Sequence, residues 1–401
     1  MMVFRLVSIG FAAVLTVVGC GPTRSVDPEA EKTYLADKPV PAHALFRKIV
    51  SEGERNHVLN RMRAGLAAME LGHDEVAAET FDEALLTIET VYAGNEQAKK
   101  ARGAFTAEDR KVFRGEPYER AMAFYYRGLL YLLDGDYENA RASFRSGSLQ
   151  DTLAEKEEFR QDFALLEFLE GWSSQCNGDQ DLAEEAYALA KSHNDAFVVP
   201  GNKDNLLLLA DVGYAPVKYA EGQHKELLKV KGNSRKGMKS VKARVSGKAE
   251  SLPYVESILW QAKSRGGREV DSVLAGKANF KETTKGAAQA AAMVSSASMT
   301  VSQMQAVQGN LDAARTAAGF GAAAGLVSIF SQMASDAAKP AADIRHWDNL
   351  PEDVLYGTAR VDGSDTPEIT FDGISSAVRQ GGGARCKVAW TRFPATSLGE
   401  G

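Results

Sequence analysis

Apolar and small residues recur at helical spacing through residues 43–197, and three stretches of this region share one arrangement. Each stretch carries a glycine, a second glycine, an alanine, an aromatic residue and a small residue at matched spacing. Small residues let two antiparallel helices approach closely, the second glycine can end the first helix in the left-handed conformation, and the aromatic residue is expected to fill the gap to the next repeat. The matched residues are Gly65, Gly72, Ala77, Phe81 and Ala84; Gly128, Gly135, Ala140, Phe144 and Gly147; and Gly171, Gly178, Ala183, Tyr187 and Ala190.

This arrangement resembles the tetratricopeptide repeat (TPR), whose period is about 34 residues. The second glycines of the three stretches are 63 and 43 residues apart, so the repeats are not uninterrupted. The larger insert runs from Thr90 to Pro117 and contains a helix-like stretch of its own. We therefore expect a TPR-like helical domain over residues 43–200, with lengthened helices or an inserted hairpin.

TPR arrays commonly bind a peptide or a partner protein on the concave face that the first helix of each repeat lines. The register places Tyr125, Phe168 and Trp172 on that face, together with Met62, Leu66 and Leu129. Tyr125, Phe168 and Trp172 are therefore the candidate partner-binding residues. The alternative is that these side chains pack on the C-terminal half of the chain or on one another.

After Pro200-Gly201 the helical spacing gives way to short apolar or alternating runs, which are typical of strands. Together the runs predict a small, mostly antiparallel sheet assembled from both ends of an α+β domain over residues 201–401. The expected fold class is mainly α: a TPR-like array followed by this α+β domain. The runs are 206–209, 240–246, 354–361, 369–371 and 387–393, with a glycine turn at 381–383.

The two ends of this domain flank an Ala/Gly-rich segment at about 284–340, in which residues 286–311 and 316–335 carry no charge. We expect an Ala-rich helical hairpin whose small faces pack together or on a partner. The alternatives are a membrane or oligomer contact and a flexible insertion. Leu, Ile and Phe are scarce in both runs, which weighs against a membrane span.

Residues 1–19 have the pattern of a bacterial secretion signal, a single arginine followed by an uncharged run that is too short for a comfortable membrane span. The run ends at Val17-Val18-Gly19-Cys20, which resembles a lipobox. The resemblance implies that Cys20 receives diacylglycerol and that Gly21, in place of aspartate, directs the protein to the outer membrane, facing the periplasm. The alternative is an ordinary signal peptide that contains a cysteine. Residues 20–42 are expected to form a flexible tether, because they are rich in Pro, Asp and Glu.

If Cys20 carries lipid, Cys176 and Cys386 remain, 210 positions apart in differently patterned segments. A periplasmic location would permit a disulfide between them. We nevertheless favour two unpaired structural cysteines. Neither has a histidine or second cysteine at ligand spacing, so zinc is not expected.

The net charge of −6, from 53 acidic and 47 basic residues, is too small to suggest nucleic-acid binding as the main task. Residues 225–248 hold nine Lys or Arg and one acid. This run is either a contact for anionic lipid or cell-wall polymer or, as we favour, the solvated face of two strands. No aromatic residue interleaves with these bases, which also disfavours a nucleic-acid platform.

A search for catalytic patterns finds no phosphate loop, no nucleophile elbow and no histidine pair at metal-ligand spacing. His346-Trp347-Asp348 is the one noticeable triplet. We expect Trp347 to plug the core where the chain turns into the sheet, with Asp343 as a cap or ion partner. We therefore expect no enzymatic activity, no cofactor and no metal.

Three motifs occur in the same order and resemble a family of uncharacterised bacterial TPR lipoproteins: residues 111–122 leading into 135–141, residues 212–218 and residues 343–351. The resemblance implies an architecture rather than an activity. The function that we expect is that of a lipid-anchored envelope adaptor, which binds a partner protein or peptide of unknown identity and no nucleic acid. The alternatives are a self-assembling structural lipoprotein that uses the Ala-rich segment, and a cell-wall-acting enzyme.

Overall fold

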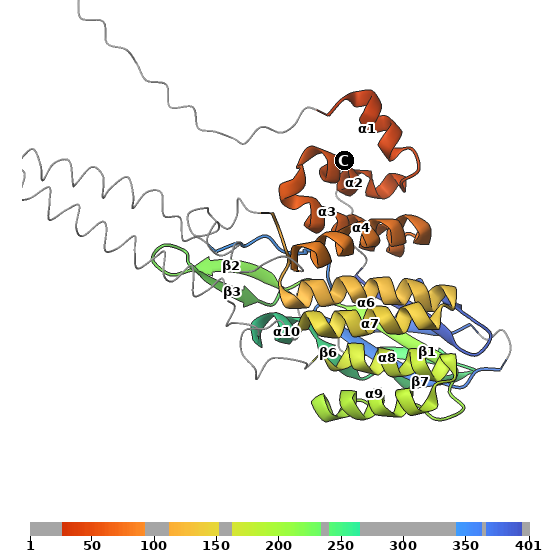
Figure 1. The fold of residues 1–401 in the computed structure, drawn as a ribbon. Coiled ribbons are helices and arrows are strands. Elements are labelled where there is room, and N and C mark those ends of the chain that lie inside the picture. The colour runs from red at the N-terminus through yellow and green to blue at the C-terminus, as the bar shows by residue number, and fades with distance from the viewer. Residues whose placement is uncertain are drawn as a thin grey trace, which may run out of the picture.

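The computed structural model describes residues 26–92, 112–151, 163–233, 240–264, 342–362 and 366–394. The signal-like residues 1–19, Cys20, most of the insert after Thr90 and the Ala/Gly-rich segment at 284–340 lie outside the described residues. Within the described ranges the chain is mainly helical with a sheet part (Figure 1).

The helices come first in the chain and stack as successive pairs (Figure 1). They are α1 (Pro28–Leu35), α2 (His43–Ser51), α3 (His57–Glu70), α4 (Asp74–Tyr92), α6 (Pro117–Asp134), α7 (Tyr137–Asp151), α8 (Ala164–Asn177) and α9 (Gln180–His193), with short 3-10 turns at Val40–Ala42 and Glu54–Asn56. A later short helix, α10 (Ile258–Ser264), lies beside the sheet.

The three predicted helical hairpins are the pairs α3–α4, α6–α7 and α8–α9. The second glycines, at the turns between the paired helices, have left-handed backbones, with φ of 83° at Gly72, 79° at Gly135 and 97° at Gly178. The aromatic residue of each hairpin lies over the first glycine of its own hairpin, and Phe81 also stacks on Tyr126 of the next hairpin, as predicted, with 6.0 Å between ring centroids. A Cβ added at Gly128 would lie 2.4 Å from the Phe144 ring, so the aromatic side chain fills the space above the first glycine of its own hairpin.

The predicted tether over residues 20–42 is wrong from Pro28 onward, because α1 is an ordered helix. Asp27 caps its first turn, and Pro28 at the first position has a φ suited to a helix start. Leu35 is buried against the helical core, and Glu31 pairs with Arg47 of α2 at 2.6 Å. The Pro and acidic residues that suggested a tether are the start signals of this helix.

Among the described residues the strands form three sheets, where one small sheet was expected. A five-stranded sheet has the order β10-β11-β1-β7-β6, a four-stranded sheet has the order β5-β4-β8-β9, and β2 and β3 form a separate hairpin. Every pairing is antiparallel except that of β1 with β11, which is parallel. The strands are β1 (Leu206–Val212), β2 (Val217–Glu221), β3 (Leu227–Lys231), β4 (Val241–Val245), β5 (Lys248–Ser251), β6 (Tyr254–Ser257), β7 (Asp353–Ala359), β8 (Glu368–Phe371), β9 (Ile374–Ser375), β10 (Arg379–Gly382) and β11 (Lys387–Phe393).

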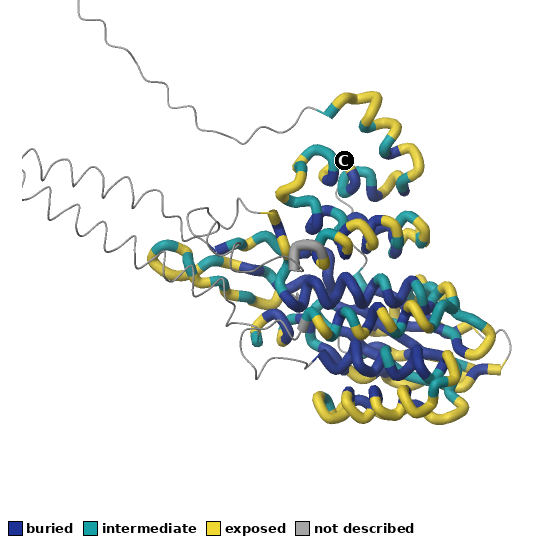
Figure 2. The backbone as a smooth tube through the Cα atoms, viewed as in Figure 1, coloured by how far each residue is buried: buried dark blue, intermediate teal, exposed yellow. Residues whose placement is uncertain are grey.

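Strand β1 lies in the centre of the molecule and is buried along its whole length, as Figure 2 shows for the inner strands. Its side chains alternate between two cores. Leu207 and Leu209 join the core shared with the helices, whereas Leu206 and Leu208 join the core shared with the four-stranded sheet. The fold therefore has three layers: helices, the five-stranded sheet and the four-stranded sheet.

The larger of the two cores joins helical residues such as Phe46 and Trp172 to sheet residues such as Val354 and Trp390. The change from helices to strands falls between His193 and Leu206, near the expected domain boundary at residue 200. The two halves nevertheless share this core, so part of the apolar surface of each half is buried against the other.

Candidate functional site

The three residues expected to bind a partner are buried inside the protein. The exposed fraction of the side chain is 0% for Tyr125, 1% for Phe168 and 0% for Trp172. Met62, Leu66 and Leu129, from the same predicted face, are buried as well. The prediction of an open aromatic groove is therefore wrong, and the alternative that these side chains pack on the C-terminal half is the one observed.

The five-stranded sheet fills the space of the expected groove. Tyr125 and its neighbour Tyr126 donate hydrogen bonds of 2.9 and 2.8 Å to the two carboxylate oxygens of Asp211 on β1. Burial, reinforced by the Asp211 charge, raises the pKa of both tyrosines, so their hydroxyls stay protonated and can donate. Further along the array, the Phe168 ring packs on Tyr356 of β7 with 4.6 Å between ring centroids. The aromatic face of the array is thus bound by the chain itself.

Asp211 makes the stability of this interface depend on pH. Burial raises the pKa of Asp211 from 3.8 to about 6, against the opposing influence of the Arg392 guanidinium and the tyrosine hydrogen bonds. Because the folded-state pKa lies above the unfolded one, the folded chain holds the proton more tightly. The stabilisation that results is complete below pH 4 and is lost as the pH rises through 6.

We expect the Asp211→Asn variant to lose this dependence. In the wild type, the ionisation of Asp211 should make the free energy of unfolding about 2 kcal/mol lower at pH 7.5 than at pH 4.5. Urea titrations of both proteins at these two pH values measure the difference. Asp362→Asn, which changes a carboxylate with 85% of its side chain exposed, is the matched control and should keep the wild-type dependence. Equal pH dependence in wild type and Asp211→Asn would contradict the assignment.

The three motifs that carried the family resemblance meet in one buried cluster. Glu119 comes from the first motif, Lys218 from the second, and Arg345 and Trp347 from the third. The Lys218 ammonium lies 2.6 Å from Glu119 Oε2 and donates to the Arg345 carbonyl at 3.2 Å. The other Glu119 oxygen accepts from the Trp347 backbone N–H at 2.8 Å. Both charged side chains are almost fully enclosed, with 1% exposed for Lys218 and 0% for Glu119.

Aromatic rings surround this ion pair. The Lys218 ammonium lies 5.5 Å from the Phe113 ring centroid and 5.6 Å from the Tyr118 ring centroid, within the range of cation–π contact. Trp347 is 1% exposed and packs edge-on against Tyr126, so the predicted core plug is confirmed. Asp343 is the predicted ion partner and pairs with Arg345 at 2.6 Å. The cluster joins α6, β2 and the segment before β7.

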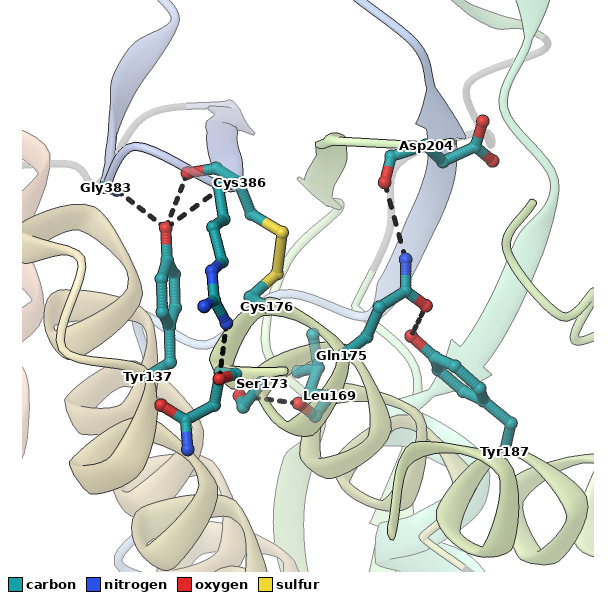
Figure 3. Close-up of a disulfide and its surroundings, with 11 residues drawn as sticks. Tyr137, Leu169, Ser173, Gln175, Cys176, Tyr187, Asp204, Gly383 and Cys386 are labelled. Atoms are coloured by element: carbon teal, nitrogen blue, oxygen red, sulfur yellow. Dashed lines mark hydrogen bonds between the residues drawn. A yellow bond between two sulfur atoms is a disulfide. The ribbon is translucent and has the colours of Figure 1, made fainter. Parts of the chain in front are cut away.

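Cys176 of α8 and Cys386, just before β11, form a disulfide (Figure 3). The expectation of two unpaired cysteines is therefore wrong. The fold brings their Cα atoms to 5.6 Å, although 210 positions separate them in the sequence. Sequence reasoning missed the bond because the distance along the chain says nothing about which strand a helix will meet.

The disulfide belongs to a longer contact between the β10–β11 hairpin and the glycine turns of the array. Arg379 of β10 bonds to Asp74 at the first turn. Tyr137, beside the second turn, accepts from the Gly383 N–H at 2.8 Å and donates to the Cys386 carbonyl at 2.7 Å (Figure 3). Arg385 donates to the Asn177 carbonyl at 2.6 Å beside the third turn. The hairpin thus touches all three turns.

An open pocket of about 330 Å³ lies at β6, an edge strand of the five-stranded sheet. Two large aromatic side chains at this pocket are about half exposed, Tyr254 at 46% and Trp260 at 49%. The lining residues are His193, Asn194, Tyr254, Val255, Glu256, Ser257, Trp260 and Asp353. Sequence analysis did not single these residues out, because an exposed aromatic residue looks the same in a sequence as a buried one.

The described residues hold no group of three or more His, Cys, Asp or Glu side chains arranged to bind a metal ion. In the same ranges, no helix has the length and apolar composition that a membrane span requires. Comparison with known protein families, with curated proteins and with solved structures finds no match to this chain.

Proposed function

We propose that this chain is a lipid-anchored adaptor of the cell envelope, held in the outer membrane and facing the periplasm, that binds a partner protein and catalyses no reaction. In this proposal Cys20 carries the lipid and residues 43–200 form a TPR-like array. The array serves as a frame for the C-terminal sheet, and the partner binds to the outer surface of the combined structure.

The observation that carries this proposal is the disulfide between Cys176 and Cys386. Disulfides persist in oxidising compartments such as the periplasm and are rare in the cytoplasm. The bond therefore supports export, in agreement with the signal pattern of residues 1–19 and the lipobox-like sequence at Cys20. It also fastens the array to the sheet, which supports a rigid body that presents a fixed outer surface.

Two further features support binding rather than catalysis. The strongly enclosed polar groups, Asp211 and the Lys218–Glu119 pair, are satisfied by partners within the chain. Two of the exposed aromatic side chains in the described ranges, Tyr254 and Trp260, lie instead at the β6 pocket, where they offer apolar surface to a partner. Exposed aromatic residues of this kind are enriched at protein interfaces.

Lipidation and partner binding are tested in the same cells. We expect an alkyne fatty acid to label the full chain and Cys20→Ala to abolish the label. The Cys176→Ala/Cys386→Ala double variant should stay labelled. A photocrosslinking residue placed in turn at the exposed positions Leu86, Trp260 and Ile374 should give, for at least one position, an adduct of defined mass. Persistent labelling of Cys20→Ala would refute the anchor, and the lack of an adduct at every position would refute the adaptor.

A further inference from the structure

The β6 pocket has an acidic lining. Asp353 contributes a partly buried carboxylate and is preceded by Glu352, whereas both carboxylate oxygens of the buried Glu256 accept hydrogen bonds from Leu165 and Gln261. Lys and Arg are absent from the described residues that line the pocket. The basic group among them is His193, whose Nδ1 lies 2.8 Å from Oε2 of the buried Glu167, so its positive charge, when present, is already balanced. Lys263 is exposed on the same short helix as Trp260 but does not line the pocket.

The carboxylate of Asp353 is held in a partly enclosed position. Burial raises the pKa of Asp353, and the neighbouring Glu352 charge acts in the same direction, while a hydrogen bond involving Ser257 opposes them. A carboxylate in such surroundings is stabilised by a cation that enters the pocket. Tyr254 and Trp260 also line the pocket, and aromatic rings favour the same kind of group, because the face of an aromatic ring attracts a cation.

The backbone of β6 is poorly suited to pairing with an added strand. The strand has four residues, and its pairing with β7 is interrupted by a bulge between Tyr254 and Glu256. The Asn194 side-chain amide donates to the Val255 carbonyl at 2.6 Å, which occupies that acceptor. Short, bulged edges with occupied backbone groups resist strand addition. A ligand is therefore recognised through its side chain rather than by extending the sheet.

We propose that the β6 pocket binds the ammonium or guanidinium group of a lysine or arginine side chain on the partner protein. The cation faces Asp353, and its aliphatic stem packs along Trp260 and Tyr254. A volume of about 330 Å³ is at the lower end of the range for ligand pockets. The half-exposed rings extend beyond the pocket, where they can contact residues that flank the basic side chain. This assignment of the partner's chemistry rests on the proposed adaptor function.

Tryptophan fluorescence of the full chain in detergent gives a local readout. The chain has four tryptophans. Trp172, Trp347 and Trp390 are at most 1% exposed, whereas Trp260 is 49% exposed, so a surface ligand changes mainly the emission of Trp260. The probes are four peptides of identical Gly/Ser/Ala background with a central lysine, arginine, norleucine or glutamate, and lysine amide as a free amine.

We expect the lysine and arginine peptides to bind at least tenfold more tightly than the norleucine and glutamate peptides and to change Trp260 emission. Asp353→Asn should weaken the binding of the lysine peptide by three- to tenfold. Asp362→Asn, a matched change beyond the opposite end of β7, should leave binding unchanged. Added salt should weaken binding as well, because the contact is between charges.

Several outcomes overturn the proposal. They are no binding of any peptide at millimolar concentration, equal binding of the norleucine peptide, and wild-type affinity in Asp353→Asn. Lysine amide that binds as tightly as the lysine peptide would assign the pocket to free amines. A Trp260→Ala variant that converts a dimer to a monomer would assign it to a second copy of the chain. Crosslinked adducts that persist unchanged in Asp353→Asn would leave the adaptor function intact and refute this site alone.

Discussion

Replacing Lys218 by methionine should lower the free energy of unfolding by about 3–5 kcal/mol, the usual cost of removing one partner of a buried ion pair. The ammonium of Lys218 lies 2.6 Å from Glu119 and 3.8 Å from Glu116, and the side chains of Lys218 and Glu119 are 1% and 0% exposed. Without Lys218, the buried Glu119 carboxylate loses its counter-charge, and the N–H groups of Glu116 and Trp347 remain as donors to it among the described residues. Urea unfolding followed by circular dichroism at pH 7.5 measures the loss.

Two further variants separate the ion pair from general effects of substitution. Lys242→Met makes the same change at an exposed position of β4 and should alter the free energy of unfolding by less than about 0.5 kcal/mol. The Lys218→Met/Glu119→Gln double variant removes both charges, so it should lose less than the sum of the two single variants. A Lys218→Met protein within 1 kcal/mol of wild type would show that this pair does not hold the three motifs together.

The helical hairpins were predictable because the signals that form them are local. The left-handed glycines at 72, 135 and 178 end one helix and begin the turn to the next, and each is followed at a fixed spacing by the aromatic residue that packs on the first glycine of its hairpin. Strand β11 was equally predictable, since its alternation of apolar and polar residues at period two is visible in the sequence. The prediction for β1 stopped three residues short, because a continuous apolar run does not show where a doubly buried strand ends.

The function of the array's inner face was not predictable in the same way. Tyr125, Phe168 and Trp172 have the same sequence pattern whether they are covered by a partner or by the chain's own sheet. Asp211, which decides between these possibilities, follows the apolar run of β1 and gives no sign that two tyrosines 85 residues away will donate to it. The burial of Lys218 and Glu119 was equally hard to predict, because lysine and glutamate side chains are usually solvated. Contacts of this kind depend on the packing of whole layers.

Reducing the Cys176–Cys386 disulfide should lower the free energy of unfolding by about 2–5 kcal/mol. The bond closes a loop with a sequence separation of 210, so it removes many conformations from the unfolded chain. It also fixes α8 to the β10–β11 hairpin, which contacts the other two glycine turns through Arg379 and Tyr137. We therefore expect one cooperative transition that moves to lower urea concentration in the presence of a reductant.

The Cys176→Ala/Cys386→Ala double variant is the control for this experiment. Its transition should lie near that of the reduced wild type and should not respond to the reductant. Alkylation of the unfolded wild type should add two labels per chain after reduction that are absent before it. Both cysteines are at most 5% exposed, so the labels require unfolding as well as reduction. Full alkylation without a reductant would show that the bond is not formed in the mature protein, and it would remove the main support for an oxidising location.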